Sequence, residues 1–238
     1  MRMRTSLALS HLLVLTIIAP SSASALTVVR GTNSSETVWV GMVDVTGDGV
    51  SGRVPVACWA LGSSSATFSI IGTTSGLDDD YAVHGDASDS GTGNDWMSLI
   101  VTNGTAVPGP CGAIGGTWNR LTYNGYFLDL AGDAGNETRM HDGGGSGDTF
   151  LSGNDGNDFL QQWSSIGWAR GDDDDDTVYG FTGTSADVLY GDDGDDCLWD
   201  GNNSWLVFHC GNGSDRYSNL NSGTMTSCET SDASCGGF

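Results

Sequence analysis

From residue 144 to residue 218 the chain repeats a nine-residue pattern in which glycines and polar residues surround single apolar positions. Two of the clearest copies are residues 153–161 (GNDGNDFLQ) and 191–199 (GDDGDDCLW). Each copy places a glycine-rich turn and an aspartate before three strand-forming residues. Because one copy cannot bury its apolar residue alone, a short fixed period predicts units that stack on their neighbours.

The remaining apolar positions also indicate strands, because β-type runs are separated by glycine and serine and helical periodicity is almost absent. We therefore predict an all-β chain. Residues 101–120 interrupt the period and carry Cys111, and we expect a disulfide to hold this excursion. The expected parts are a signal peptide at 1–25, a β-rich N-terminal cap region at 26–75, degenerate repeats with the excursion at 76–131, the clear repeats at 132–218 and a disulfide-bonded tail at 219–238.

The sixth position of each unit, called here the aspartate slot, follows a rule of its own. Its occupants from residue 144 onward are Thr149, Asp158, Gly167, Asp176, Asp187, Asp196, Trp205 and Asp215. Aspartate thus returns in every second unit, while the units between are degenerate. Earlier copies place Asp95 and Glu137 in the same slot, and the second fits imperfectly because Arg139 falls where an apolar residue belongs.

The apolar and aromatic positions predict an inside and an outside. The expected inward-facing residues are Leu151, Leu160, Val178, Leu189, Leu198, Val207 and Tyr217. The expected outward-facing aromatic residues include Tyr179, Tyr190, Trp199 and Phe208, which would form an exposed row suited to stacking on sugars. Covering by the tail, or simple stiffening of the strands, is the alternative role for this row.

The composition of the chain indicates that folding needs a source of positive charge. A net charge of −22 and 37 glycines among 238 residues would ordinarily favour disorder. Only three of the 30 acidic residues are glutamates, and the short aspartate side chain binds its own turn or a metal held by that turn. A divalent cation would neutralise these carboxylates and add its binding energy to folding. The negative charge also makes nucleic acids and anionic membranes poor partners.

The N-terminus predicts export. Arg2 and Arg4 precede an apolar run at 7–19 and an Ala-x-Ala ending at residue 25, which is the pattern of a secretory signal peptide. No later stretch is long and apolar enough to cross a bilayer. We expect a secreted, monomeric protein with disulfides among its six cysteines, although six cysteines allow fifteen pairings.

The phrase Gly-Gly-x-Gly-x-Asp-x-U-x, in which U is a large apolar residue, resembles the repeat of the RTX, or hemolysin-type, calcium-binding family. The resemblance covers 132–218 well and 76–100 weakly. It implies a right-handed parallel β-roll, or β-solenoid, in which two units complete one coil and Ca²⁺ lies between turns stacked on one edge. Carried onto this chain, it implies a one-sided column of ligands formed by Asp158, Asp176, Asp196 and Asp215.

Three further carboxylates are weaker candidates for the same role. Glu137 would extend the column backwards, Asp95 lies in a weak copy, and Asp187 would lie on the opposite edge. The alternative for all of these residues is a turn held by side-chain hydrogen bonds without a metal.

The tail resembles the closing unit of secreted bacterial members of this repeat class, because residues 210–217 (CGNGSDRY) are followed by Cys228 and Glu229. The resemblance implies a Cys210–Cys228 disulfide. On proximity along the chain we prefer Cys58–Cys111 and Cys197–Cys235 for the other two.

The sequence contains no lysine and none of the common catalytic motifs. We expect a calcium-binding structural or adhesive module that is not an enzyme. The alternative is a module that binds a cell-surface glycan or matrix through the aromatic row.

Overall fold

A computed structural model describes residues 26–123, 126–137, 139–141, 148–163, 166–180, 188–201, 207–218, 224–232 and 234–235. The expected signal peptide lies outside these residues, as do Asp187 and Trp205.

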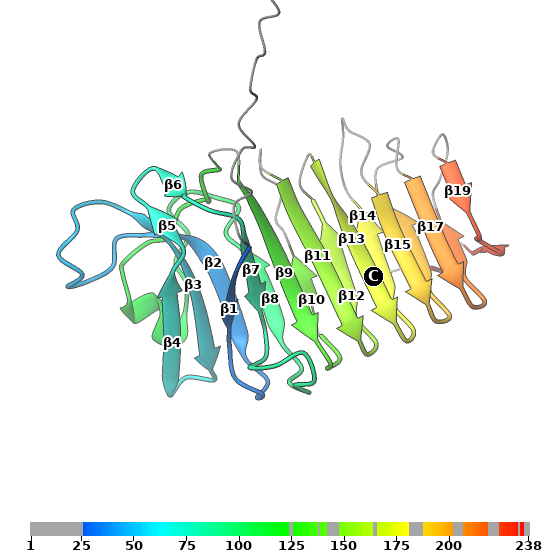
Figure 1. Cartoon of the computed structure of the whole chain (residues 1–238), viewed down its shortest axis with the longest axis horizontal. Coiled ribbons are helices and arrows are strands. Elements are labelled where there is room, and N and C mark those ends of the chain that lie inside the picture. The colour runs from blue at the N-terminus through cyan, green and yellow to red at the C-terminus, as the bar shows by residue number, and fades with distance from the viewer. Residues whose placement is uncertain are drawn as a thin grey trace, which may run out of the picture.

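Two long β-sheets account for most of this structure (Figure 1). The first sheet has eight parallel strands in the order β1 (Thr27–Arg30), β7 (Tyr81–His84), β9 (Phe127–Asp133), β11 (Asp148–Asp155), β13 (Ile166–Asp173), β15 (Val188–Asp193), β17 (Val207–Asn212) and β19 (Thr224–Thr226). The second sheet has ten strands in the order β20 (Thr230–Ser231), β18 (Arg216–Ser218), β16 (Cys197–Asp200), β14 (Thr177–Gly180), β12 (Phe159–Gln162), β10 (Arg139–His141), β8 (Trp96–Leu99), β2 (Thr37–Val43), β3 (Val54–Leu61) and β4 (Ser65–Ile70).

The second sheet is parallel from β20 to β2 and ends in the antiparallel hairpins β2–β3 and β3–β4. A short hairpin of β5 (Gly72–Thr73) and β6 (Gly76–Leu77) and a 3-10 turn, η1 (Gly109–Ala113), complete the described elements. No helix in the described ranges is long and apolar enough to cross a membrane. The prediction of an all-β chain is confirmed.

From β7 onward the chain passes alternately between the two sheets, so each strand pairs with strands of neighbouring repeats. Apolar residues of both sheets face the space between the sheets. Leu130 and Leu151 of the first sheet and Leu160 and Leu198 of the second are fully buried in one continuous core. A single unit could not enclose these side chains, so each depends on the strands above and below it.

The pairing register corrects one predicted inward position. Val207 was expected to face the core and Phe208 to face outward, but Phe208 is fully buried and pairs with Leu189. Val207 is half-buried and pairs with Val188. This unit therefore has an additional residue before β17, because the parallel ladder needs a buried side chain next to Leu189.

The register also resolves the misfit at Arg139. Met140, and not Arg139, pairs with Leu160 and is fully buried in the core. Arg139 is half-buried, and its guanidinium donates a hydrogen bond to the side chain of Gln161. This unit has one more residue between its aspartate slot and its apolar position than the next unit has, and a strict nine-residue count cannot show this.

The three disulfides join the expected partners: Cys58 with Cys111, Cys197 with Cys235, and Cys210 with Cys228. The first fixes the 101–120 excursion to β3, as predicted. It lies in a second buried cluster, with Val56 and Trp118, that belongs to the N-terminal part of the chain. The other two hold the tail against the last turns, where the stack has no further neighbour. Three disulfides fit an extracellular protein.

Removing the Cys58–Cys111 disulfide is expected to lower the free energy of unfolding by about 4 kcal/mol, because it closes a long loop of the unfolded chain. Its partners are 53 residues apart, against 18 for Cys210 and Cys228. Denaturant unfolding of the double alanine variants checks this. The Cys58/Cys111 pair should cost more than the Cys210/Cys228 pair, and the reverse order would contradict the loop-length explanation.

Candidate metal sites

The turns that join the first sheet to the second stack along one edge of the molecule. In the turns that begin at Gly132, Gly153, Gly171 and Gly191, the second residue has a left-handed backbone, with φ of 79° at Asp133, 75° at Asn154, 80° at Asp172 and 76° at Asp192. Only glycine, asparagine and aspartate adopt this conformation at small cost. The local sequence therefore fixes the turn, and the turn delivers the aspartate slot to the same place in every repeat.

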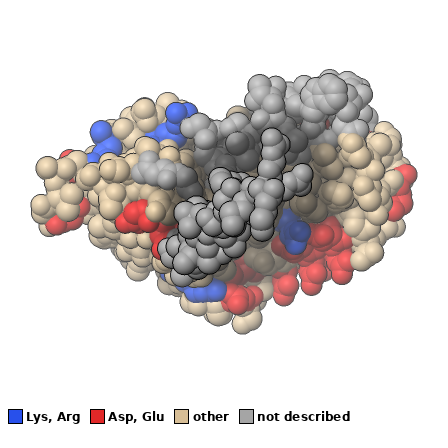
Figure 2. Space-filling view, turned by 45° about the horizontal axis from the view of Figure 1, so that its top comes forward, with Lys and Arg blue, Asp and Glu red and all other residues tan. Residues whose placement is uncertain are grey.

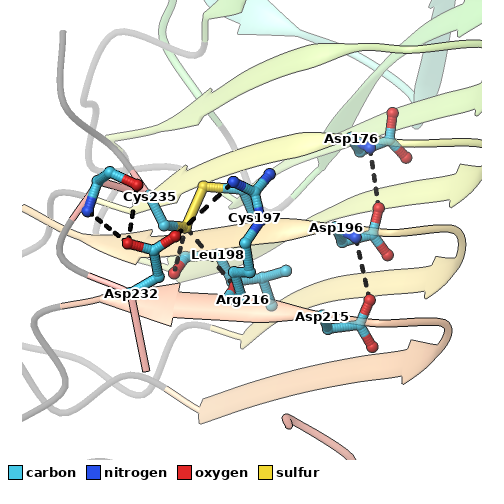
Figure 3. The surroundings of a disulfide bond; sticks show 9 residues. Asp176, Asp196, Cys197, Leu198, Asp215, Arg216, Asp232 and Cys235 are labelled. Carbon is cyan, nitrogen blue, oxygen red and sulfur yellow. Dashed lines mark hydrogen bonds and ion pairs between the residues drawn. A yellow bond between two sulfur atoms is a disulfide. The ribbon is translucent and has the colours of Figure 1, made fainter. Parts of the chain in front are cut away.

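The aspartate slots form a column in which every carboxylate binds the backbone of its neighbour. One carboxylate oxygen accepts the N–H of the slot residue in the preceding turn, as in Asp158 from Glu137 (2.8 Å), Asp176 from Asp158 (2.7 Å), Asp196 from Asp176 (2.9 Å) and Asp215 from Asp196 (3.0 Å). Figure 3 shows the last two of these bonds. The structure thus brings together the four predicted column residues and Glu137.

The other oxygen of each column carboxylate does not accept a backbone N–H. In Glu137, Asp158, Asp176, Asp196 and Asp215 this oxygen is closed off from solvent and has no hydrogen-bond partner among the described residues. The five side chains are at most 3% exposed. A buried carboxylate oxygen without a proton, a donor or a cation is strongly unfavourable. Each turn therefore needs a positive charge or a proton at this position.

Glycine at the first position makes room for this oxygen. A Cβ at Gly153, Gly171 or Gly191 would lie 2.2, 2.1 or 2.2 Å from the second oxygen of Asp158, Asp176 or Asp196, respectively. No side chain fits at such distances. The glycines at these three positions therefore leave the space that the carboxylates of their own turns occupy.

Burial raises the pKa of these acids well above the usual value. Loss of solvation is the main cause and raises the pKa of Asp176 to about 9 and that of Asp196 to about 7, with neighbouring carboxylates adding to the effect. Burial likewise raises the pKa of Glu137 and of Asp158. Without a bound cation, the folded column therefore retains protons in the neutral range.

The column includes Asp95, one of the weaker candidates, and is extended by two glutamates that were not predicted, Glu36 and Glu229. Asp95 joins it by accepting the N–H of Glu36 (2.6 Å), and Glu229 extends the other end by accepting the N–H of Asp215 (2.9 Å). At the first turn Glu36 accepts the N–H of Thr32 (2.8 Å), a residue of its own turn, and the column ends there. Residues 31–36 (GTNSSE) form a six-residue turn that begins with glycine and ends with an acid, a signal that the sequence offered.

A second, exposed ladder runs beside the column at the fifth position of the turns. Here the side chain accepts the N–H of the following turn, as Asp175 does from Asp195 and Asp195 from Ser214, each at 2.9 Å. Asp173, Asp174 and Asp193 are exposed in the same turns. Figure 2 shows acidic side chains gathered along one margin of the molecule. Water solvates these exposed carboxylates, whereas the buried carboxylates of the column are not solvated.

On the opposite edge, the described residues include a fully buried acid, Asp200, at the end of β16. The Thr149 hydroxyl hydrogen-bonds to the Tyr123 hydroxyl (2.8 Å), and a Cβ at Gly167 would lie 2.0 Å from the Thr149 carbonyl oxygen. Asp187, the candidate ligand on that edge, lies outside the described residues. Its role stays a prediction.

The four aromatic residues expected on one face do not form one face. Phe208 is in the core. Tyr179 stacks on Trp199 in the second sheet, with ring centroids 4.3 Å apart, and is only 8% exposed. Tyr190 belongs to the first sheet, where it stacks on His209. The alternation of the chain between two sheets separates residues that the sequence count had placed in one row.

One further group has the composition of a metal site. His84, Asp89 and Asp133 place a ligand atom each within 4.8 Å of one another. The Arg30 guanidinium pairs with Asp89 and lies 3.5 Å from Asp133, while His84 Nδ1 lies 2.7 Å from the same Asp133 oxygen. Because the Arg30 guanidinium already offsets the negative charge of Asp89 and Asp133, a bound cation would stabilise this group less than it would stabilise the column.

No family model, curated protein or solved structure matches this chain.

Proposed function

We propose that this protein is a secreted, calcium-binding β-roll that serves as a structural or adhesive module and is not an enzyme. The observation that carries the proposal is the column of enclosed carboxylate oxygens, one per turn, that lack a hydrogen-bond partner among the described residues. Ca²⁺ takes six to eight oxygen ligands from carboxylates and backbone carbonyls, and stacked turns are rich in both. Asp158, Asp176, Asp196 and Asp215 would hold the ions, with Glu137 and Asp95 extending the row.

The charge of the column favours a divalent cation over protons alone. Neighbouring carboxylates raise one another's pKa, as Asp196 does for Asp176 and Asp215 does for Asp196. An ion between two turns would neutralise both acids at once, whereas protons must be bound at each acid separately. The bound ion supplies a positive charge, and the residues of this chain supply the enclosed oxygens and the glycine-lined space.

Enclosure also argues against catalysis at the column. The free oxygens are closed off from solvent and lie against the first glycine of their own turns, so a substrate has no path to them. A glycan-binding role through the aromatic row is the alternative. The separation of Tyr179 and Trp199 from Tyr190, and the burial of Phe208, do not favour it.

Equilibrium dialysis of the full chain against calcium tests the proposal. Asp176→Asn keeps an oxygen for the Asp158 N–H but removes the charge, so this variant should lose at least one bound ion. Asp155→Asn, at an exposed position of a nearby turn, is the matched control and should bind as many ions as the unsubstituted protein. An unsubstituted chain that binds no calcium would refute the proposal.

A further inference from the structure

The turn between β7 and β8 is built differently from the others. Its first position is Gly85 and its slot residue is Asp95, so it spans eleven residues where the turn from Gly132 to Glu137 has six. The five additional residues lie between Asp86 and Gly93. They are held on both sides, because Ala87 N–H donates to the Asn33 side chain (3.0 Å) and Ala134 N–H donates to the Gly91 carbonyl (3.0 Å).

This enlarged turn encloses a carboxylate that does not belong to the column. Asp86 is the second residue of its turn, and its side chain is 0% exposed. Its Oδ2 accepts the N–H of Gly93 (2.9 Å), and its backbone N–H donates to Asp133 (3.1 Å). Its Oδ1 is closed off from solvent and has no hydrogen-bond partner among the residues that the structure describes.

The surroundings of Asp86 are acidic. Glu36, Asp95, Asp133 and Glu137 are all nearly or fully buried, and each interacts electrostatically with Asp86. The nearby positive groups, Arg30 and His84, contact Asp89 and Asp133 instead. Like the column residues, Asp86 therefore has a buried carboxylate oxygen that lacks a compensating positive charge. Asp86 is the second residue of its turn, whereas every column residue is a slot residue.

The Oδ1 atom of Asp86 and a backbone carbonyl oxygen both lie beside Gly93. A Cβ at Gly93 would lie 2.6 Å from Asp86 Oδ1 and 2.9 Å from the carbonyl oxygen of Ser34. Two hard oxygens thus face the open side of Gly93, one from each of two adjacent turns. Carboxylate and carbonyl oxygens are the ligands of calcium and not of softer metals.

We propose that the enlarged turn at 85–95 binds one Ca²⁺ of its own, held by the enclosed oxygen of Asp86 and the carbonyl oxygen of Ser34. This ion is separate from the column, because neither ligand is a slot residue. The added residues close the site from solvent, which explains why this turn is longer than the others. The inference does not depend on whether the column binds calcium.

Native mass spectrometry of the full chain at rising calcium concentrations tests the proposal. Asp86→Asn should lose one bound ion. Gly93→Ala should lose the same ion without a change of charge, because its methyl group would lie against both oxygens. Gly116→Ala is the matched control, since no atom lies within 4 Å of its added Cβ, and it should lose none. Asp176→Asn should keep the Asp86 ion even if the column fails to bind calcium.

Melting curves separate this role from a purely structural one. At pH 8 in chelator, Asp86→Asn should melt no lower than the unsubstituted protein, because it removes an uncompensated buried charge. In calcium the same variant should melt lower, because the ion is lost. An unchanged ion count in Asp86→Asn, or a melting loss of equal size in chelator and in calcium, would overturn the proposal.

Discussion

Replacing Gly171 with alanine is expected to lower the free energy of unfolding by about 3 kcal/mol, which for a chain of this size is a fall in melting temperature of roughly 6–12 °C. The added Cβ would lie 2.1 Å from the second oxygen of Asp176 and 2.8 Å from the carbonyl oxygen of Gly191. Neither atom can move freely, because Asp176 is held by the Asp158 N–H and the carbonyl belongs to the neighbouring strand.

Gly116→Ala is again the control, since the added Cβ meets no atom within 4 Å and the backbone there has no left-handed φ. Its effect should stay within about 0.5 kcal/mol. Thermal unfolding of both variants in chelator isolates the steric effect from any bound ion. Equal melting temperatures for the two variants would mean that the column does not need the space that Gly171 leaves.

The largest expected effect is a reversal of the pH dependence of stability by calcium. Burial raises the folded-state pKa of Asp176 from 3.8 to about 9 and that of Asp196 to about 7. The folded chain then holds more protons than the unfolded chain over this range. In chelator, the free energy of unfolding should therefore fall as the pH rises from about 4 to about 9.

In saturating calcium the ions take the place of the protons, and they bind the ionised carboxylates more tightly as the pH rises. The protein should then be more stable at pH 8 than at pH 5. Calcium at one hundred times its dissociation constant adds about 2.7 kcal/mol for each independent site. Melting curves at pH 5 and pH 8, with calcium, with magnesium and with chelator, check both parts. A chelator curve that rises with pH would contradict the raised pKa values, and coincident curves with calcium and chelator at pH 8 would contradict the calcium proposal.

Several features of this protein can be predicted from the sequence alone. The return of aspartate in every second unit, at Asp158, Asp176, Asp196 and Asp215, is visible in the sequence, and the resemblance to a parallel β-roll repeat implied that these residues lie on one edge. The alternation of glycine, aspartate and single apolar residues predicts an all-β chain. The preference for pairing Cys58 with Cys111, which rested on their proximity along the chain, agrees with the structure.

Other features depend on the pairing of strands that are distant in the chain. A one-residue shift moves a side chain from the core to the surface, so only the ladder shows that Phe208 and Met140 are buried while Val207 and Arg139 are not fully buried. The turn that contains Glu36 has a recognisable sequence, but its contact with the column needed the structure, because the hydrogen-bond partner of Glu36, Asp95, is 59 residues away.

The sequence by itself determined the type of element, the period and the chemical character of the repeated turn, because these are set by residues within a few positions of one another. The tertiary structure decided which carboxylate oxygens are enclosed, which aromatic residues share a sheet, and that Asp86 lies buried inside a turn of unusual length. Burial and the absence of a donor depend on every neighbour of an atom. Those neighbours come from separate turns, and only the folded stack brings them together.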